Sequence, residues 1–410
     1  MHILLIHQAF AAIDEPGGTR HHELARALVQ QGHQVTIIAS PISYLTGKAT
    51  SEQKKTMHEN GITIYRTYTY SALHRSFFHR LISFFSFMAS SFFRAVQVHR
   101  VDVVWGTSPP IFQGVTAWLV ARLKRVPFVF EVRDLWPAFA IAVGVLNNRV
   151  IIRLSHWLEK FLYRHADAVV VNSPGYVEHV RQRGARQVVL VPNGVDVSMF
   201  PLEGNGDAFR STHHLEGKFL VFYTGAHGMS NDLPLLIESA QILQSIEAIH
   251  FIFIGDGKEK TALIQLAQQK GLHNISFLPP VEKKEMGKVM QAANCCVAIL
   301  KPVEMYKTTY PNKVFDYMAA AKAIVLVIDG VIRRVVEQAQ CGIFAQPGDP
   351  TAVADAIRTL YHDPVQCNTM GLNGRVYVES HFNRQETARQ LMDVFQKVKK
   401  YGRKDSDRRR

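Results

Sequence analysis

The sequence predicts an α/β protein of two doubly wound domains, each with a parallel sheet covered by helices on both faces. Short apolar runs alternate with amphipathic stretches along the chain, which is the pattern of repeated strand–helix–strand units. The expected strands are continuously apolar instead of alternating, which indicates sheets that are buried on both faces. At 410 residues the chain is too long for one core and fits two domains of similar size.

The first domain is expected to span residues 1–200. Helices fill the intervals between its strands, for example His21–Gln31, which Gly32 would end because glycine readily adopts the left-handed conformation. The expected strands are Ile3–His7, Val35–Ala39, Ile62–Thr67, Val101–Trp105, Phe128–Val132, Ala168–Asn172 and Val188–Pro192.

The second domain is expected to span residues 201–383, beginning with the polar stretch Pro201–Gly217. Its expected strands are Phe219–Thr224, His250–Ile254, Ile275–Leu278, Cys295–Leu300, Ala323–Val327 and Gly342–Ala345, and helices follow at Thr351–Tyr361, Pro364–Ser380 and Arg384–Lys399. Two such domains in tandem would place their strand-end crevices opposite each other, so ligands are expected in a cleft between the domains.

The composition limits the partners of the protein. The formal net charge is +13, but the basic residues are spread along the chain and no nucleic-acid motif is visible, so an anionic membrane surface or a diphosphate-bearing substrate suits the charge better. No apolar run reaches eighteen residues and the N-terminus lacks the features of a signal peptide. The four cysteines have no metal-ligand spacing and are expected to be buried thiols in a cytoplasmic protein.

The C-terminal tail is basic and poor in apolar residues. This composition predicts disorder from Lys397 to Arg410, with residues 401–410 forming a tail beyond the last helix. A solvated tail without a role and a contact with lipid headgroups are both open.

The most informative segment runs from Tyr310 to Val325. Pro311 opens a short helix that places Lys313 and Asp316 one turn apart. The first N–H groups of a helix attract anions, a lysine beside them adds a mobile charge, and a carboxylate accepts hydrogen bonds from sugar hydroxyls. Together these groups suggest a nucleotide diphosphate, although on this segment alone an ordinary helix turn with a surface Lys and Asp is the better interpretation.

This segment resembles a motif of the retaining glycosyltransferase family 4, whose fold is called GT-B. The family has an acidic residue, seven further residues, and a glutamate followed by a small-residue helix and a strand. Asp316 takes the second acidic position, but Thr308 stands at the first, and the nearest acid is Glu304. The run Pro311 to Lys313 resembles bacterial surface-polysaccharide transferases similar to those that add N-acetyl-fucosamine to O-antigen units, and the resemblance covers about residues 1–395.

The resemblance implies a metal-independent glycosyltransferase of hexosyl or N-acetylhexosaminyl type that needs no cofactor. It would move a sugar from a nucleotide-diphospho-sugar, expected to be UDP-linked, to a growing lipid-linked polysaccharide or glycolipid. The first domain would bind the acceptor and the second the nucleotide sugar, with the helix at 384–400 crossing back to the first domain. The implied location is cytoplasmic, peripheral at the inner face of the cell membrane.

The family usually holds the diphosphate with a Gly-Arg pair and a following Lys-Gly pair. Ala226 and His227 stand near the arginine position here, and Asn231 and Asp232 stand where Lys-Gly would fall. These departures, with the missing first acid, favour an alternative: a catalytically degenerate GT-B protein that binds a sugar nucleotide or a partner transferase without turnover.

The donor is expected to be bound by loops at strand ends, because glycines let the backbone approach a ligand and helix N-termini present N–H groups. Arg20 is a candidate phosphate fork, whereas the glycine pairs could also be plain turns. The donor-binding candidates are Gly17, Gly18, Thr19, Arg20, Gly225, His227, Gly255, Asp256, Glu304, Thr308, Asn312, Lys313 and Asp316.

The catalytic candidates are Arg133, Asp134 and Lys313. Arg133 and Asp134 end a strand, at the place where many family members have a histidine that touches the transferred sugar. The alternative for Arg133 is a structural salt bridge with Asp134 or Glu131. No metal-diphosphate site is visible, and neither are a three-glycine dinucleotide fingerprint, a phosphate-binding P-loop or a serine hydrolase elbow.

The stretch Phe77–Val98 carries seven phenylalanines on one expected helix with basic flanks. Its polar residues Arg80, Ser83, Ser86, Ser90, Arg94 and Gln97 recur every three or four positions, as on one helix face. A helix packed on the first sheet and an interfacial membrane helix are both open, and the number of aromatic rings favours membrane contact.

Overall fold

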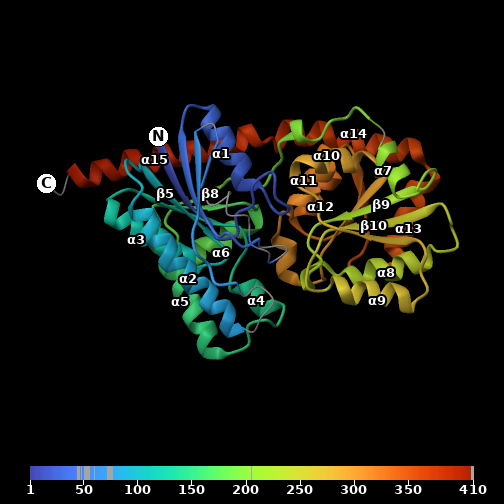
Figure 1. Ribbon diagram of the computed structural model, residues 1–410, viewed down its shortest axis with the longest axis horizontal. Coiled ribbons are helices and arrows are strands. Elements are labelled where there is room, and N and C mark those ends of the chain that lie inside the picture. Colours follow the sequence, from blue (N-terminus) through green and yellow to red (C-terminus); the bar gives the residue numbers. More distant parts are fainter. Residues whose placement is uncertain are drawn as a thin grey trace. The chain divides into compact units, whose positions relative to one another are not determined.

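The computed structural model divides the chain into two units (Figure 1). Unit 1 comprises Met1–Ala11, Thr19–Pro192 and Arg384–Arg410, and unit 2 comprises Ala12–Gly18 and Asn193–Asn383. The structure describes residues 1–43, 47, 49, 56–59, 61–71, 77–204 and 206–407. The change of unit follows Pro192 instead of residue 200, because Val195 and Phe200 are buried in the core of unit 2.

Unit 1 is built on an eight-stranded sheet of order β3-β4-β2-β1-β5-β6-β7-β8, parallel except for the edge pair β3–β4. Its strands are β1 His2–Ile6, β2 Gln34–Ala39, β3 Thr56–Glu59, β4 Ile62–Arg66, β5 Val103–Ser108, β6 Phe128–Val132, β7 Ala168–Val171 and β8 Val188–Leu190. Its helices are α1 Arg20–Gln30, α2 Phe77–Val96, α3 Phe112–Lys124, α4 Ala138–Ala142, α5 Arg149–His165, α6 Val177–Gln182 and α15 Arg384–Asp407, with a short 3₁₀ turn at Pro174–Tyr176.

Unit 2 is built on a six-stranded sheet of order β11-β10-β9-β12-β13-β14, in which every pair is parallel. Its strands are β9 Phe219–Thr224, β10 Ile249–Ile254, β11 Ile275–Leu278, β12 Cys295–Ile299, β13 Ala323–Val327 and β14 Gly342–Phe344. Its helices are α7 Asp207–Thr212, α8 Leu233–Ile242, α9 Lys260–Gln269, α10 Lys283–Gln291, α11 Asn312–Ala319, α12 Val331–Gln338, α13 Pro350–His362 and α14 Pro364–His381, with 3₁₀ turns at Val197–Met199, Met229–Asn231 and Glu304–Thr308.

The prediction of two doubly wound α/β domains is confirmed, and each predicted strand has a counterpart. The central strands are buried along their whole length, as their continuous apolar character indicated. The four cysteines are buried free thiols, as predicted. Burial raises the pKa of the Cys341 thiol to about 12, so it stays protonated at neutral pH.

One prediction of local structure is wrong, and one strand was missed. The strand expected at Val101–Trp105 lies at Val103–Ser108, because the small residues that follow Trp105 are also buried in the sheet. A side chain at Gly106 would meet the Cβ atom of Ala117 at 2.6 Å, so this position requires glycine. Strand β3 has an alternating exposed pattern and was not predicted at all.

The disorder predicted from Lys397 onward is also wrong for the part of the tail that the structure describes. Helix α15 continues to Asp407, and residues 408–410 lie outside the described range. Leu391, Phe395 and Val398 are buried, and the Phe395 ring lies 5.6 Å from the Trp105 ring. The helix therefore completes unit 1, where it packs along α1.

Candidate functional site

The chain order of the strands in unit 2 reverses between β9 and β12, which are neighbours in the sheet. In open parallel sheets, ligands bind outside the carboxyl ends of the strands at such a reversal. Gly225, Ala226 and His227 directly follow β9. The loop predicted to bind the donor therefore begins at this strand reversal.

The loops after β9 and β10 are in backbone contact. A side chain at Gly255 would approach the carbonyl oxygen of Gly225 to 1.9 Å, and the His227 N–H donates to the carbonyl oxygen of Asp256 over 2.8 Å. Gly225 has a φ of 129°, which other residues rarely adopt. Gly225, Gly255 and Asp256 thus shape the turn through their backbones, and the Asp256 carboxylate accepts from the Gly257 N–H over 2.8 Å.

His227 is fully buried at this turn. Its ring lies 5.9 Å from Tyr223 and about as far from Phe253 and Phe277, and neither ring nitrogen has a hydrogen-bond partner among the described residues. Burial, with smaller contributions from Lys260 and Lys313, lowers its pKa to about 4. The imidazole is therefore neutral at pH 7 and retains hydrogen-bonding capacity.

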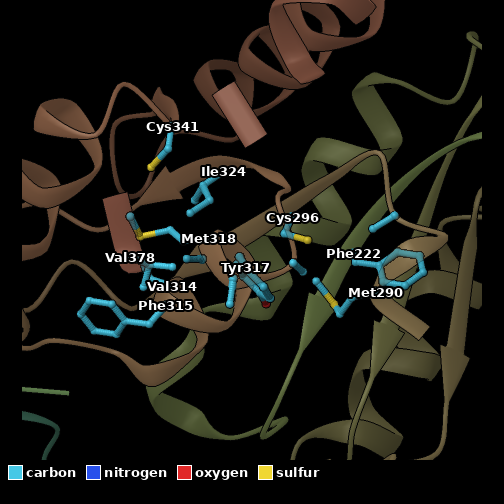
Figure 2. Packing of buried hydrophobic residues seen from close by; sticks show 14 of the residues in the cluster. Phe222, Met290, Cys296, Val314, Phe315, Tyr317, Met318, Ile324, Cys341 and Val378 are labelled. Carbon is cyan, nitrogen blue, oxygen red and sulfur yellow. The ribbon is translucent and has the colours of Figure 1, made fainter. Parts of the chain in front are cut away.

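Helix α11 brings Lys313 to the same place. The face formed by Val314, Phe315, Tyr317 and Met318 is buried in the core of unit 2 (Figure 2), and the Tyr317 hydroxyl accepts from the Thr224 N–H over 3.0 Å. This bond ties the helix to the end of β9, while Pro311 precedes its first turn.

The Lys313 ammonium lies over the Tyr223 ring, 3.9 Å from the ring centroid, and 3.5 Å from Asn231 Oδ1. Burial lowers its pKa to about 7. The structure thus joins Gly225, His227 and Lys313 from the sequence prediction with Tyr223 and Asn231, which that prediction did not include. This group combines a cation, a neutral imidazole and closely apposed loop backbone, which together suit an anionic ligand.

Asp316 lies on the same helix but is engaged by an ion pair. Lys283 Nζ is 2.5 Å from Asp316 Oδ1 and 5.0 Å from the centre of the Phe200 ring. Lys283 opens α10 without any distinguishing pattern around it, so sequence reasoning missed it. A hydroxyl ligand of Asp316 would share this carboxylate with Lys283.

The described contacts of the remaining donor-binding candidates on unit 2 are with residues other than Lys313 and His227. The Glu304 side chain is 82% exposed and pairs with Lys307, the Thr308 hydroxyl donates to the Met305 carbonyl, and Asn312 is exposed. Gly17 and Gly18 are exposed in the loop Ala12–Gly18, where the Ile13 carbonyl accepts from the Lys284 N–H. None of the described hydrogen bonds or ion pairs joins these residues to Lys313 or His227.

Arg20 has a structural role in unit 1 that was not predicted. It is buried, it bonds Glu131 over 2.9 Å, and it donates to the carbonyl oxygens of Pro192 and Val191. His21 occupies the other oxygen of Glu131 at 2.8 Å. These contacts turn the Arg20 guanidinium toward Glu131 and the backbone, which argues against the predicted role as a phosphate fork. Thr19 is likewise engaged, since its hydroxyl donates to Glu23 over 2.6 Å.

Arg133 and Asp134 follow β6, as predicted. The Arg133 guanidinium donates to the Pro109 carbonyl over 2.7 Å, and its backbone N–H donates to the Ser108 carbonyl. Burial raises the pKa of Asp134 to about 6, although the nearby Arg133 acts in the opposite direction. This carboxyl can therefore gain or lose a proton close to neutral pH.

His7 is a further buried polar residue that sequence reasoning missed. It follows β1, which neighbours β5 at the strand reversal of unit 1. Its Nδ1 is 2.9 Å from the Thr107 hydroxyl, and its Nε2 has no hydrogen-bond partner within the described residues. A histidine directly after an N-terminal strand was the signal that could have identified it.

The comparisons with known proteins cover both units. Residues 17–194 match the family model described as "Glycosyl transferase 4-like domain", and residues 218–363 match "Glycosyl transferases group 1". The chain is 26% identical over 292 residues to WcaI of Escherichia coli, provisionally named a colanic acid biosynthesis glycosyl transferase, and the match covers 68% of this chain and 72% of that protein.

Two solved structures share the fold of this chain over both units. Sucrose-phosphate synthase from Thermosynechococcus elongatus has a TM-score of 0.75 at 18% identity, and the match covers 97% of this chain and 98% of that one. Anabaena HepE, solved in complex with UDP and glucose, has a TM-score of 0.74 at 16% identity, with 97% and 100% covered. At these identities the structures establish a shared fold.

Proposed function

Because the chain belongs to the GT4-type glycosyltransferases of the GT-B fold, we propose that it uses a UDP-sugar as donor and retains the anomeric configuration of the transferred sugar. The transferred group is a hexosyl or N-acetylhexosaminyl residue. The acceptor is a growing lipid-linked polysaccharide or glycolipid, in keeping with the name of the relative WcaI. The enzyme acts without a metal at the cytoplasmic face of the cell membrane.

The position of Lys313 carries the donor half of this proposal. Its ammonium lies at the strand reversal of unit 2, beside the loop after β9, where a diphosphate would meet a cation and backbone N–H groups. A diphosphate leaving group develops negative charge, which preorganised donors of this kind stabilise. The likeness in fold to HepE, which was solved with UDP, supports the choice of nucleotide.

The other donor contacts follow from the same placement. We assign His227 to the diphosphate or the sugar, because its buried ring nitrogens have no partner in the described part of the chain. Asp316 would accept from the ribose while keeping its contact with Lys283. Gly17, Gly18, Gly225 and Gly255 would allow close approach of the backbone, and Thr19, Asp256, Glu304, Thr308 and Asn312 remain secondary candidates.

On unit 1, we propose that Arg133 contacts the transferred sugar and that the Asp134 carboxyl accepts or donates a proton during the reaction. Both follow a strand end, and the pKa of Asp134 near 6 suits a carboxyl that exchanges a proton at physiological pH. We leave Arg20 out of the proposed site, because its side chain is buried and donates to Glu131 and to two backbone carbonyl groups.

The first test is a screen of sugar nucleotides by thermal shift, since a ligand that binds only the folded state raises the melting temperature. UDP-sugars are expected to stabilise the parent and to lose this effect in Lys313→Met. Lys307→Met is the matched control, because Lys307 is nearby in sequence but pairs with the exposed Glu304. Stabilisation only by non-uridine nucleotides would exclude the proposed donor.

The second test is turnover, measured as UDP released with lipid-linked saccharide acceptors. If the protein is a transferase, it should release UDP at a rate that depends on the acceptor. If it binds the donor but releases no UDP with any acceptor, it is the catalytically degenerate binding protein. Analysis of the product anomer by nuclear magnetic resonance tests retention, and an inverted product would contradict it.

A further inference from the structure

Helix α2 presents a stripe of apolar side chains outward. The outward positions Phe78, Ile82, Phe85, Phe93 and Val96 are spaced three, four or eight residues apart, and the three phenylalanines are 55–68% exposed. In a soluble protein the apolar stripe of such a helix faces the core.

The polar stripe of α2 is used within unit 1. The Ser86 hydroxyl accepts from the Tyr70 N–H over 2.9 Å, and the Ser90 hydroxyl donates to the Tyr68 carbonyl over 2.6 Å. Phe87 is fully buried, and the Phe84 ring stacks on Phe112 of α3. These contacts fix the rotation of the helix, so the outward stripe of phenylalanines is a feature of the packed unit.

Neighbouring helices extend the apolar surface. Helix α2 packs on α3, and α3 packs on α5 (Figure 1). Leu119 and Leu123 are exposed on α3, and Val150, Leu154 and Trp157 are each about 60% exposed on α5, at positions that share one face. We call the exposed apolar side chains of α2, α3 and α5 the three-helix surface.

All but one of the Lys, Arg, Asp and Glu residues on these helices are basic. The helices carry eight lysine and arginine residues and a single acid, Glu159, which is buried against Arg183 and His179. The basic residues are Arg80, Arg94, Arg122, Lys124, Arg149, Arg153, Lys160 and Arg164. Six of these residues are exposed, whereas Arg94 lies over the Tyr65 ring and Lys124 donates to the carbonyl groups of Val96 and Val98. Exposed basic side chains together with exposed aromatic and aliphatic ones complement an anionic lipid interface, where the apolar groups enter the headgroup region.

We propose that the three-helix surface binds the interface of an anionic lipid bilayer. None of the helices within the described residues is long and apolar enough to cross a membrane. The proposal deepens the proposed function, from which it takes only the lipid-linked acceptor. Binding through this surface would fix the orientation of unit 1 on the bilayer in which a lipid-linked acceptor would be embedded.

The test is binding of the full chain to vesicles of phosphatidylglycerol and phosphatidylethanolamine, measured by flotation. Phe85→Ser with Phe93→Ser is expected to reduce binding at least tenfold. Leu372→Ser with Val376→Ser is the matched control, because both residues are exposed apolar side chains on α14 of unit 2. Binding equal to that of the parent in a folded Phe85/Phe93 variant would overturn the proposal.

Two further measurements test whether α5 contacts the lipid and whether its basic residues contribute to binding. Brominated lipids are expected to quench the exposed Trp157, and the Trp157→Phe variant is expected to lose that quenching. Arg149→Gln with Arg153→Gln is expected to weaken binding to anionic vesicles several-fold. If the parent binds no vesicles and forms a dimer that the Phe85/Phe93 variant loses, the surface is an interface between copies of this chain and the lipid proposal fails.

The outcome is independent of the proposed reaction. A chain that binds vesicles through this surface but turns over no sugar nucleotide would retain the membrane proposal and lose the function. Turnover with a soluble acceptor, without vesicle binding, would remove the membrane proposal and the membrane location, and would retain the transfer from a UDP-sugar.

Discussion

Lys313 and His227 are weakly basic because both are buried at the end of β9. Burial lowers the pKa of Lys313 to about 7 and that of His227 to about 4, so at neutral pH the free protein holds Lys313 partly charged and His227 neutral. A diphosphate would favour the charged form of Lys313, and binding is therefore coupled to uptake of a proton.

We expect donor affinity to fall as the pH rises above about 7, by at most tenfold per pH unit, because the unliganded Lys313 then loses its proton before binding. Titration calorimetry between pH 6 and 9, in two buffers of different ionisation enthalpy, measures affinity and proton uptake together. Lys313→Met should show weaker binding without the proton uptake. An affinity that is flat across this range would remove Lys313 from the diphosphate.

Lys313→Ala should also lower turnover more than it raises KM, because the developing charge of the leaving group is greatest in the transition state. Steady-state rates with saturating acceptor check this expectation. A rise in KM at unchanged kcat would indicate ground-state binding alone.

Asp316→Ala should weaken donor binding by about 1.5–3 kcal/mol, the range for hydrogen bonds to a charged group. Because the same change leaves Lys283 without its carboxylate partner, the Lys283→Met variant and the double variant complete a cycle that separates the two effects. Unchanged affinity for the donor in Asp316→Ala would exclude the ribose contact.

At the residue scale, the sequence identified polar types at strand ends but not their partners. The motif around Asp316 was visible, whereas its contact with Lys283 joins α11 to a different helix. Arg20 carried the charge expected of a phosphate ligand, yet it is bound to Glu131, 111 positions along the chain. Pairings over such separations depend on the fold and leave no local pattern.

At the scale of elements, the buried group of Arg20, His21 and Glu131 joins the start of α1 to β6. Burial alone would raise the pKa of the Glu131 carboxyl, but His21 and Arg20 outweigh it and hold that pKa below its ordinary value. The carboxylate therefore stays charged and satisfies a guanidinium that has no contact with water.

Glu131→Gln should destabilise the protein by about 3–5 kcal/mol, because it leaves a buried arginine without its counter-charge. Urea denaturation followed by circular dichroism measures the change. Glu386→Gln is the control, since its pair with Arg389 is exposed and should contribute less than about 1 kcal/mol. Equal effects of the two changes would contradict this account.

Periodicity predicted helices and central strands well, because it reports burial. It failed for β3, whose residues alternate between exposed and half-buried, and for the end of β5, where small and polar residues are buried. In α2 the spacing of the polar residues predicted a helix correctly, but sequence alone could not tell that the Ser86 and Ser90 hydroxyls bond the backbone at Tyr70 and Tyr68. These bonds help to fix the helix rotation that leaves Phe78, Phe85 and Phe93 exposed.

Across the whole molecule, several histidines are buried in the neutral form. Burial lowers the pKa of His21, His227 and His250 to about 4 and that of His7 well below its ordinary value. Between pH 6.5 and about 4 the unfolded chain therefore binds more protons than the folded one, and stability falls as the pH falls through this window. Asp134 opposes the trend, since its raised pKa favours folding on acidification.

We expect the melting temperature to drop between pH 6.5 and 4.5, with each histidine contributing at most about 1.4 kcal/mol per pH unit. Differential scanning calorimetry across this range measures the slope. His250→Gln should make the slope shallower, since it removes one of the titrating groups. A melting temperature that does not change with pH would show that these imidazoles are not buried in the neutral form.

The return of α15 to unit 1 has a consequence for synthesis on the ribosome. Helix α15 covers Trp105 through Phe395 and ties to α1 through the 2.9 Å pair of Arg384 with Glu23. All of Asn193–Asn383 is translated before this helix, which takes about 10–40 s at 5–20 residues per second. During that interval the nascent unit 1 exposes the apolar side chains that α15 later covers, Trp105 among them, and chaperones could bind there.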